Sequence, residues 1–214
     1  MPDTYILPNE YGDLLSHYQK LKQTDPRRNV WIVKPSNSSR GRGIHIIDDI
    51  NDLNVDELSI ISRYVTNPLL INGYKFDLRV YVVVTCYEPL RIYVYKEGLA
   101  RFASETYTAK FNKNNKYMHL TNYSVNKKAE SYVKNQNTDV TVSDLKNKKE
   151  NKDNKVEEVK TEETKTEEEP TESKLSLAQL KKEYAKMGCN YNETFANVKD
   201  IIIKTVMAAE SPIL

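Results

Sequence analysis

Residues 75–85 read KFDLRVYVVVT, and residues 90–96 read LRIYVYK. Both stretches are rich in β-branched and aromatic residues, and polar side chains alternate with apolar ones through much of their length, as in strands with one covered face. The residues between them, CYEP at 86–89, are typical of a turn because proline interrupts strand pairing. These stretches predict a β-hairpin, around which the rest of the chain is interpreted.

Further strands and helices are predicted on both sides of this hairpin. Three strands precede it, over residues 30–34, 43–47 and 58–65. Apolar residues at helical spacing predict helices over residues 14–21, 175–187 and 192–209, with Asn192 as the cap of the last one. The predicted fold class is α+β, with a mixed, mostly antiparallel sheet and flanking helices.

A charged segment divides the chain. Residues 1–134 hold 19 Lys and Arg against 14 Asp and Glu, and residues 135–214 hold 13 against 16, so the net charge of +2 is the sum of +5 and −3. Residues 146–174 include eight Lys, ten acidic residues and no aromatic residue. Such a stretch buries too little apolar area to offset the entropy of ordering it. We predict a disordered Lys/Glu-rich insert over residues 135–173, favoured over a transient helix held by i,i+4 ion pairs, with residues 174–214 as a helical continuation of the same domain.

Composition excludes several classes of protein. The chain has 214 residues and a mean hydropathy of −0.68, and its apolar runs are far shorter than the roughly 20 residues that cross a bilayer. Its first residues lack the basic and apolar regions of a secretion signal. Cys86 and Cys189 lie far apart without other ligands at metal-binding spacing, so neither a disulfide framework nor a zinc site is predicted. We expect a cytoplasmic protein with no membrane segment.

A basic, glycine-containing loop follows the strand predicted at 30–34. Lys34 stands at the end of that strand, and Arg40 and Arg42 alternate with Gly41 and Gly43. Glycine lets backbone N–H groups approach an anion, and arginine adds forked, charged donors. The loop is a candidate phosphate cradle, although its spacing is not that of a P-loop. A basic hairpin turn is an equally good interpretation of these residues alone.

Charged residues also line one face of the strand at 75–85. Lys75, Asp77, Arg79 and Tyr81 alternate with apolar residues. Charges on a strand with apolar flanks fit a ligand-binding cleft, in which the cations hold phosphates and Asp77 orients one of them. A salt-bridged ladder on an exposed edge is the alternative, and we favour the cleft.

Two later segments carry polar groups. Arg101 stands between apolar neighbours, and residues 118–127 read MHLTNYSVNK. A run of hydroxyl and amide side chains is more often an ordinary turn than a site. The residues of this run, taken alone, therefore favour a turn.

Six short sequence motifs outside the charged segment are informative when their sequences and their order are considered together. They read WIVKPSNSSRGRGI (31–44), ISRYVTNPLLI (61–71), KFDLRVYVVVT (75–85), PLRIYVYKEGLARF (89–102), MHLTNYSVNKK (118–128) and DIIIKTV (200–206). Together they closely resemble the tubulin-tyrosine-ligase-like family, and its polyglutamylase branch most of all. The resemblance implies an ATP-grasp fold, with nucleotide between two α+β lobes. It also implies an ATP-dependent ligase that activates a carboxylate as an acyl phosphate, which an amine attacks.

In the polyglutamylase branch, the carboxylate belongs to a glutamate side chain of the tubulin C-terminal tail or of the growing chain, and the amine is that of free L-glutamate. By this resemblance, a large group of residues contacts ATP. They are Lys34, Arg40, Gly41, Arg42, Gly43, Ser62, Arg63, Tyr64, Val65, Lys75, Asp77, Thr121 and Asn122. The adenine would lie against residues 62–65, whose backbone would read the edge of the base.

The resemblance assigns a second group of residues to L-glutamate. They are Arg101, Tyr123, Ser124 and Lys174. The family has a tryptophan after the lysine that matches Lys174, where this chain has Leu175, so the lysine stands in a changed context. Arg79 and Arg101 are the candidate catalytic residues, because fixed cations stabilise a phosphoryl-transfer transition state.

The resemblance implies ATP and Mg²⁺ as cofactors. The family's Mg²⁺ ligands are an acidic residue and a Glu-x-Asn pair that follow the last helix, so they are expected beyond Leu214, and none is assigned within this sequence. Most of the N-terminal lobe is likewise expected before residue 1. A chain without these ligands should lose most of its rate.

Three functions from different classes follow. The first is an ATP-dependent tubulin polyglutamylase, the second a non-catalytic relic that binds nucleotide or microtubules, and the third a tubulin glycylase or tyrosine ligase. The expected partners are L-glutamate and the acidic C-terminal tails of tubulin in microtubules, with no nucleic acid and no membrane. We expect a monomer on the microtubule cytoskeleton, with the cilium or basal body as candidate locations.

Overall fold

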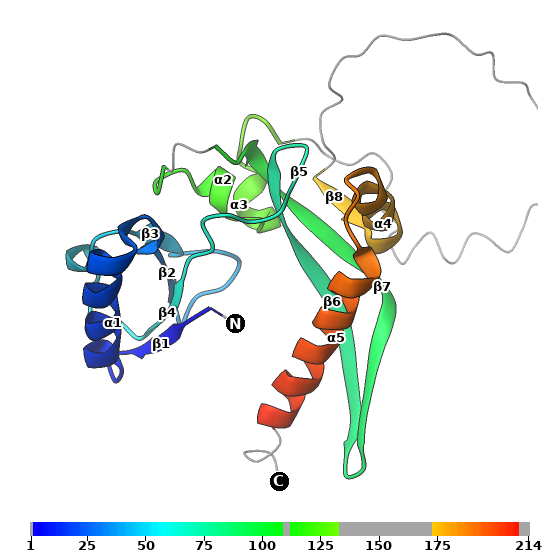
Figure 1. Cartoon of the computed structure of the whole chain (residues 1–214), viewed down its shortest axis with the longest axis horizontal. Helices are drawn as coiled ribbons and strands as arrows, with labels where there is room; N and C mark the ends of the chain where they lie inside the picture. The colour runs from blue at the N-terminus through cyan, green and yellow to red at the C-terminus, as the bar shows by residue number, and fades with distance from the viewer. Residues whose placement is uncertain (1, 109–111, 133–172, 210–214) are drawn as a thin grey trace, which may run out of the picture.

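The computed structural model describes residues 2–108, 112–132 and 173–209, which form two antiparallel sheets with helices (Figure 1). The first sheet has the strand order β1-β4-β2-β3, and its strands are β1 (Thr4–Leu7), β2 (Trp31–Pro35), β3 (His45–Ile47) and β4 (Ser59–Arg63). The second has the order β5-β6-β7-β8, with β5 (Leu70–Ile71), β6 (Tyr74–Tyr87), β7 (Leu90–Thr106) and β8 (Lys174–Ser176). The α+β class is confirmed, but the single sheet predicted from the sequence is wrong.

Helix α1 (Tyr11–Thr24) covers the first sheet, as its apolar spacing predicts. Its buried residues Leu14, Tyr18 and Leu21 share one core with Trp31 of β2 and Ile61 of β4. The short 3-10 helices η1 (Pro26–Arg28) and η2 (Ile50–Asp52) connect the elements of this lobe. The amphipathic pattern of residues 14–21 is therefore sufficient to place the helix, because only one of its faces is apolar.

The predicted hairpin is confirmed and is longer than its sequence pattern. Strands β6 and β7 pair from Tyr74↔Thr106 to Tyr87↔Leu90, so the turn predicted over 86–89 contains only residues 88 and 89. The pairing shifts register between Val80 and Val82. A side chain on Gly98, which pairs with Val80, would collide with the backbone oxygen of Arg79, so the strands approach too closely here for any larger residue.

The last elements complete the second sheet and its core. Strand β8 pairs antiparallel with β7, so Leu175 lies in a strand and not in the predicted helix. Helix α4 (Leu177–Lys186) begins one residue after Ser176, whose side chain forms a capping box with Gln179. Leu180 and Tyr184 of α4 pack in the second core with residues of β7.

Helix α5 (Tyr191–Ala208) begins two residues earlier than the predicted cap at Asn192 implies. Asn190, and not Asn192, is its N-cap, and its side chain accepts a hydrogen bond from the backbone N–H of Glu193 at 3.2 Å. Phe195 packs against the second core, although no residue of α5 is fully buried. None of the described helices is long and apolar enough to cross a membrane. The predicted insert over residues 135–173 lies outside the described residues, apart from Ser173.

Candidate functional site

The basic loop between β2 and β3 lies against the segment that carries α3 (Tyr123–Asn126). The Ser124 hydroxyl donates to the backbone oxygen of Arg40 at 2.6 Å. Gly41 has a φ of +80°, and a Cβ there would lie 2.9 Å from a methyl group of Val125 and 3.0 Å from the Asn122 amide oxygen. Glycine is therefore required at position 41 both by the backbone conformation and by the close approach.

A cavity of about 690 Å³ opens beside this loop. Its lining includes five cationic residues and no acidic one: Arg40, Arg42, Lys116, Lys127 and Lys128. Such a surface attracts anions. The geometry supports a phosphate cradle. The sequence interpretation assigned no role to the three lysines, although the end of the motif at 118–128 contains two of them.

Residues 63–65 line a second cavity of about 540 Å³, together with residues of the N-terminal segment and of η1. The backbone N–H groups of Arg63 and Tyr64 already donate to the carbonyl oxygens of Asp3 and Val30, both at 2.8 Å. Ser62 is buried in the first sheet and accepts a hydrogen bond from Thr4. Of the four residues predicted beside the adenine, Val65 is exposed and Ser62 does not line the cavity.

Lys75 of β6 is held by groups on two other segments of the chain. Its ammonium donates to the Tyr64 hydroxyl at 3.0 Å and to the backbone oxygen of His119 at 2.8 Å. It also lies 4.6 Å from the centre of the Tyr64 ring. These contacts fix the position of the Lys75 ammonium group. A lysine on an exposed strand would lack such contacts, and its side chain would be mobile.

His119, at the end of α2 (Lys116–His119), connects this group to the loop before the helix. Its Nε2 lies 2.9 Å from the backbone oxygen of Asn112, which can only accept, so Nε2 carries the proton. Its Nδ1 then accepts from the Tyr64 hydroxyl at 2.8 Å. Burial lowers the pKa of His119, which keeps the ring neutral. The sequence interpretation gave His119 no role, because a single histidine in a polar run carries no specific signal.

Burial lowers the pKa of Lys75 from 10.5 to about 8, against the opposing effect of Asp77 and with a smaller contribution from the nearby Lys34. Between these values the unfolded chain binds more protons than the folded chain. The free energy of unfolding is therefore expected to rise with pH, by about 2 kcal/mol between roughly pH 7 and pH 9.5.

Denaturant unfolding of the wild type and of Lys75→Met across this pH range measures the effect. The substitution removes the titrating group, so the difference between the two proteins should change with pH while their other groups cancel. A constant difference between the wild type and Lys75→Met would contradict the lowered pKa of Lys75.

Asp77 and Arg101 form the central ion pair of the second sheet. They face each other across β6 and β7, and the guanidinium makes two hydrogen bonds to the carboxylate, from Nε at 2.8 Å and from Nη2 at 2.6 Å. The Thr121 hydroxyl donates to the same carboxylate at 2.8 Å. The hydrogen bonds from Arg101 to Asp77 raise the pKa of the guanidinium, which stays charged.

Lys174 lies next to Arg101 on the neighbouring strand, β8. It pairs with Arg101 across β7 and β8, and its ammonium lies 4.7 Å from the centre of the Tyr123 ring. Three of the four residues predicted for L-glutamate, Arg101, Tyr123 and Lys174, therefore line one small hollow of about 10 Å³, together with Tyr132 and Ser173. The hollow is about the size of a single water molecule, so it marks where these side chains meet and does not itself enclose an amino acid. The fourth, Ser124, contacts the glycine loop instead.

Other predicted residues lie farther from these contacts. Lys34 is exposed at the end of β2, within electrostatic range of Lys75. Arg79 is exposed on β6 and has no ion pair among the described residues. Asn122 approaches Gly41. The structure thus places Lys75, Asp77, Arg101 and Thr121 in contact with defined partners, and it gives Arg79 no such partner in the described segments.

Asn126 holds the whole 120–123 segment on β7, and the sequence interpretation missed it. Its side chain is 1% exposed. The amide nitrogen donates to the backbone oxygens of Leu120 and Asn122, at 2.7 and 3.1 Å, and the amide oxygen accepts from the backbone N–H and hydroxyl of Ser104, at 2.9 and 2.8 Å. A fully bonded, buried asparagine of this kind fixes the loop that carries Thr121.

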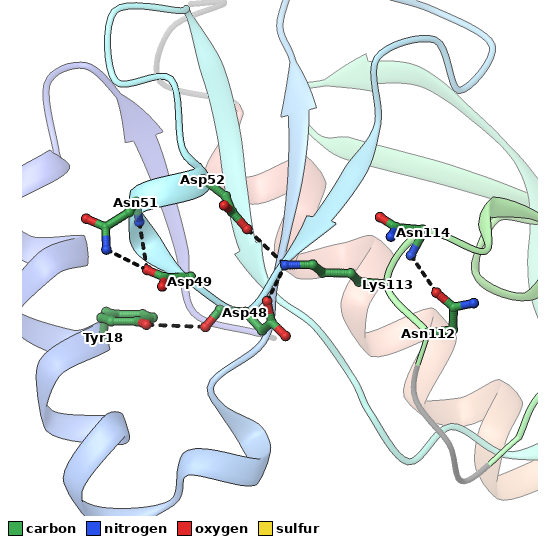
Figure 2. A network of polar contacts seen from close by, with 8 residues as sticks. All are labelled: Tyr18, Asp48, Asp49, Asn51, Asp52, Asn112, Lys113 and Asn114. Carbon is green, nitrogen blue, oxygen red and sulfur yellow. Dashed lines mark hydrogen bonds and ion pairs between the residues drawn. The ribbon is translucent and has the colours of Figure 1, made fainter.

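Lys113 links the two lobes (Figure 2). Its ammonium lies 2.6 Å from an oxygen of Asp48 and 2.9 Å from an oxygen of Asp52. Asp48 precedes η2, and Asp52 is the last residue of η2. The Lys113 hydrogen bond lowers the pKa of Asp48, and both acids raise that of Lys113. The two carboxylates are about half exposed and Lys113 is partly exposed, so the link should weaken with salt. It joins the first lobe to the loop whose Asn112 contacts His119.

Within residues 2–108, 112–132 and 173–209, no three His, Cys, Asp or Glu side chains are grouped to hold a metal ion. Cys86 and Cys189 are both free cysteines. The fixed cations and backbone groups of the described segments are suited to binding anions.

Comparison with known proteins gives a consistent result. The tubulin-tyrosine ligase family matches residues 1–164. The chain is 40% identical over 211 residues to the protein named tubulin polyglutamylase TTLL5 of Mus musculus, covering 98% of the chain and 13% of that protein. It is 47% identical over 135 residues to the probable tubulin polyglutamylase TTLL2 of Homo sapiens, covering 63% of the chain and 23% of that protein.

A third relative, named probable beta-tubulin polyglutamylase of Tetrahymena thermophila, is 35% identical over 212 residues, covering 98% of the chain and 15% of that protein. The chain thus spans less than a quarter of the length of each of these relatives. The family match nevertheless extends over more than half of the chain and includes the glycine loop and both ion-pairing strands of the hairpin. The chain belongs to the tubulin-tyrosine ligase family.

Proposed function

We propose that this chain forms part of the ATP-grasp-like core of a tubulin polyglutamylase, an ATP-dependent ligase that joins L-glutamate to glutamate side chains in the acidic C-terminal tails of tubulin. The three named relatives support this choice within the family, because each carries the name of a known or probable polyglutamylase. Tubulin is then the macromolecular partner, and the microtubule cytoskeleton is the expected location.

One observation carries the proposal: two cations stand side by side, next to a separate phosphate cradle. Arg101 and Lys174 are cross-strand partners, so their side chains emerge on one face of the second sheet. The segment 121–124 runs from this pair to the glycine loop, since Thr121 bonds to Asp77 and Ser124 to Arg40. A dicarboxylate amino acid suits the first group, and a polyphosphate suits the second.

The described residues fit a nucleotide in one further respect. The cavity beside the glycine loop is large enough for part of a polyphosphate, and the arginines and lysines that line it supply positive charge. When bound, ATP would supply the phosphoryl group that converts a carboxylate to an acyl phosphate, from which the amine of L-glutamate displaces phosphate. Mg²⁺ is expected from the resemblance, and no step is assigned to it because the described residues offer no set of ligands.

The chain's own residues then have separable tasks. Lys75, fixed by Tyr64 and the backbone of His119, holds a phosphate oxygen without the entropy loss of ordering a free lysine. Arg101 and Lys174 bind the carboxylates of L-glutamate and orient its amine. The cationic lining of the loop cavity neutralises charge that develops during phosphoryl transfer.

Transfer of labelled amino acids to microtubules tests the proposal. The protein is incubated with ATP, Mg²⁺ and microtubules, and with labelled glutamate, glycine or tyrosine in parallel. Microtubules whose acidic tails have been removed by proteolysis are the matched control. We expect ATP-dependent incorporation of glutamate alone, which disappears with the tails.

Incorporation of glycine or tyrosine in place of glutamate would overturn the polyglutamylase assignment in favour of a sister ligase. ATP binding by a folded protein without any transfer would favour a non-catalytic member of the family.

A further inference from the structure

Both oxygens of the Asp77 carboxylate are engaged within the protein. Oδ1 accepts from Nε of Arg101 at 2.8 Å. Oδ2 accepts from Nη2 of Arg101 at 2.6 Å and from the Thr121 hydroxyl at 2.8 Å. Short, charge-assisted hydrogen bonds of this kind hold the Asp77 carboxylate in a fixed orientation against Arg101. The family resemblance assigns Asp77 to the nucleotide, whereas its contacts here point to Arg101.

The strand register explains why this pair is rigid. Asp77, Arg101 and Lys174 occupy one row across β6, β7 and β8, because Asp77 pairs with Arg101 and Arg101 pairs with Lys174. Neighbouring side chains in such a row are about 5 Å apart at Cβ. Arg101 therefore lies between a carboxylate and an ammonium, and both groups favour a guanidinium turned toward Asp77.

The two hydrogen bonds also determine which part of Arg101 can reach a ligand. A guanidinium held through Nε and Nη2 cannot rotate, so Nη1 is directed away from the carboxylate. The Arg101 side chain is 24% exposed and that of Asp77 38%, so the pair lies at the surface of the sheet and not within its core. Without Asp77, the long arginine side chain would sample several rotamers and would be repelled by Lys174.

We propose that Asp77 is a positioning residue for Arg101, and that Thr121 assists it by fixing the Asp77 carboxylate. The inference rests on the proposed function, in which Arg101 binds a carboxylate of L-glutamate. Through Arg101, Asp77 acts on the amino-acid side of the reaction. Thr121 connects this side to the loop that Asn126 anchors, so the amino-acid group and the glycine-loop group share one support.

Steady-state kinetics of glutamate transfer separates the two roles for Asp77. Loss of a positioning residue weakens glutamate binding, so Asp77→Asn should raise KM for L-glutamate by roughly 10-fold or more. The KM for ATP should rise by a smaller factor, because Asp77 acts on the phosphate-binding Lys75 only through its charge. A nucleotide contact would give the reverse: an increase in KM for ATP and little change in KM for L-glutamate.

Two further sets of variants sharpen the comparison. Thr121→Val removes the hydroxyl at nearly constant shape, and Thr121→Ser keeps it. The valine variant should therefore raise KM for L-glutamate more than the serine variant does. Asp200→Asn is the matched control, because Asp200 also pairs with a cation, Lys204, at 2.6 Å, but on the exposed face of α5. Its kinetics should equal those of the wild type.

An observation independent of activity completes the test. In the ¹H–¹⁵N NMR spectrum, a guanidinium held by a bidentate pair gives a slowly exchanging Nε–H signal. We expect this signal for Arg101 in the wild type and in Asp200→Asn, and its loss in Asp77→Asn. If the wild type transfers no glutamate, the proposed function fails. The NMR signal then decides the inference by itself: its persistence in Asp77→Asn, or an ATP-specific change in KM, would overturn it.

Discussion

Asn126→Leu is expected to lower the free energy of unfolding by about 3 to 5 kcal/mol, because several buried polar groups would lose their partners at once. The Asn126 amide supplies two donors and accepts from two groups of Ser104, all inside the protein. Leucine has a similar size but offers no hydrogen bond, and water cannot reach the orphaned groups easily at a site that is 1% exposed. Equilibrium denaturation followed by circular dichroism measures the loss.

Asn197→Leu is the matched control for this change. Asn197 lies on the exposed side of α5, so the same substitution there should alter the free energy of unfolding by less than about 0.5 kcal/mol. A loss below about 1 kcal/mol for Asn126→Leu would show that the loop rearranges to satisfy its own backbone, and that Asn126 does not anchor it.

Lys75→Met is expected to weaken ATP binding by roughly 100-fold, whereas Arg79→Ala should weaken it by less than about threefold. The sequence pattern groups the two cations together on one face of the strand. The structure separates them, because Lys75 is held by Tyr64 and His119 while Arg79 is exposed. A pre-positioned, partly desolvated charge contributes far more to binding than a mobile surface charge.

Titration calorimetry with ATP near pH 7 measures both affinities, since Lys75 is charged at that pH. Arg79→Ala serves as the matched control from the same strand, and near-UV circular dichroism verifies that each variant is folded. Equal losses for the two variants would mean that the nucleotide extends over Arg79. An unchanged affinity in Lys75→Met would mean that the lysine has only a structural role.

Much of the local structure could be predicted because it depends on short-range patterns. The hairpin follows from alternation in residues 75–85 and 90–96, and α1 follows from its apolar spacing. The errors occurred where local signals compete. Leu175 fits a helical stripe, but the capping box of Ser176 starts the helix after it, and pairing with β7 draws residues 174–176 into a strand.

The candidate site was predicted only in part. Arg101, Tyr123 and Lys174 lie close together, and the glycine loop borders a cationic cavity, while the ligands assigned to them stay predictions. His119 and Asn126 were missed because a lone histidine or asparagine carries no periodic signal, and their importance depends on burial and on partners distant in the sequence. Ser124 was assigned to L-glutamate but contacts the backbone of Arg40.

The sequence by itself determined the strands β2, β3, β4, β6 and β7, the principal helices and the family, since strand alternation, helical spacing and motif order are properties of neighbouring residues. Only the tertiary structure decided that the strands form two sheets, that Asp77 bonds to Arg101, and that Lys75 is fixed while Arg79 is not. These outcomes depend on strand register and on burial. Both arise from contacts between residues far apart in the chain, which no local pattern encodes.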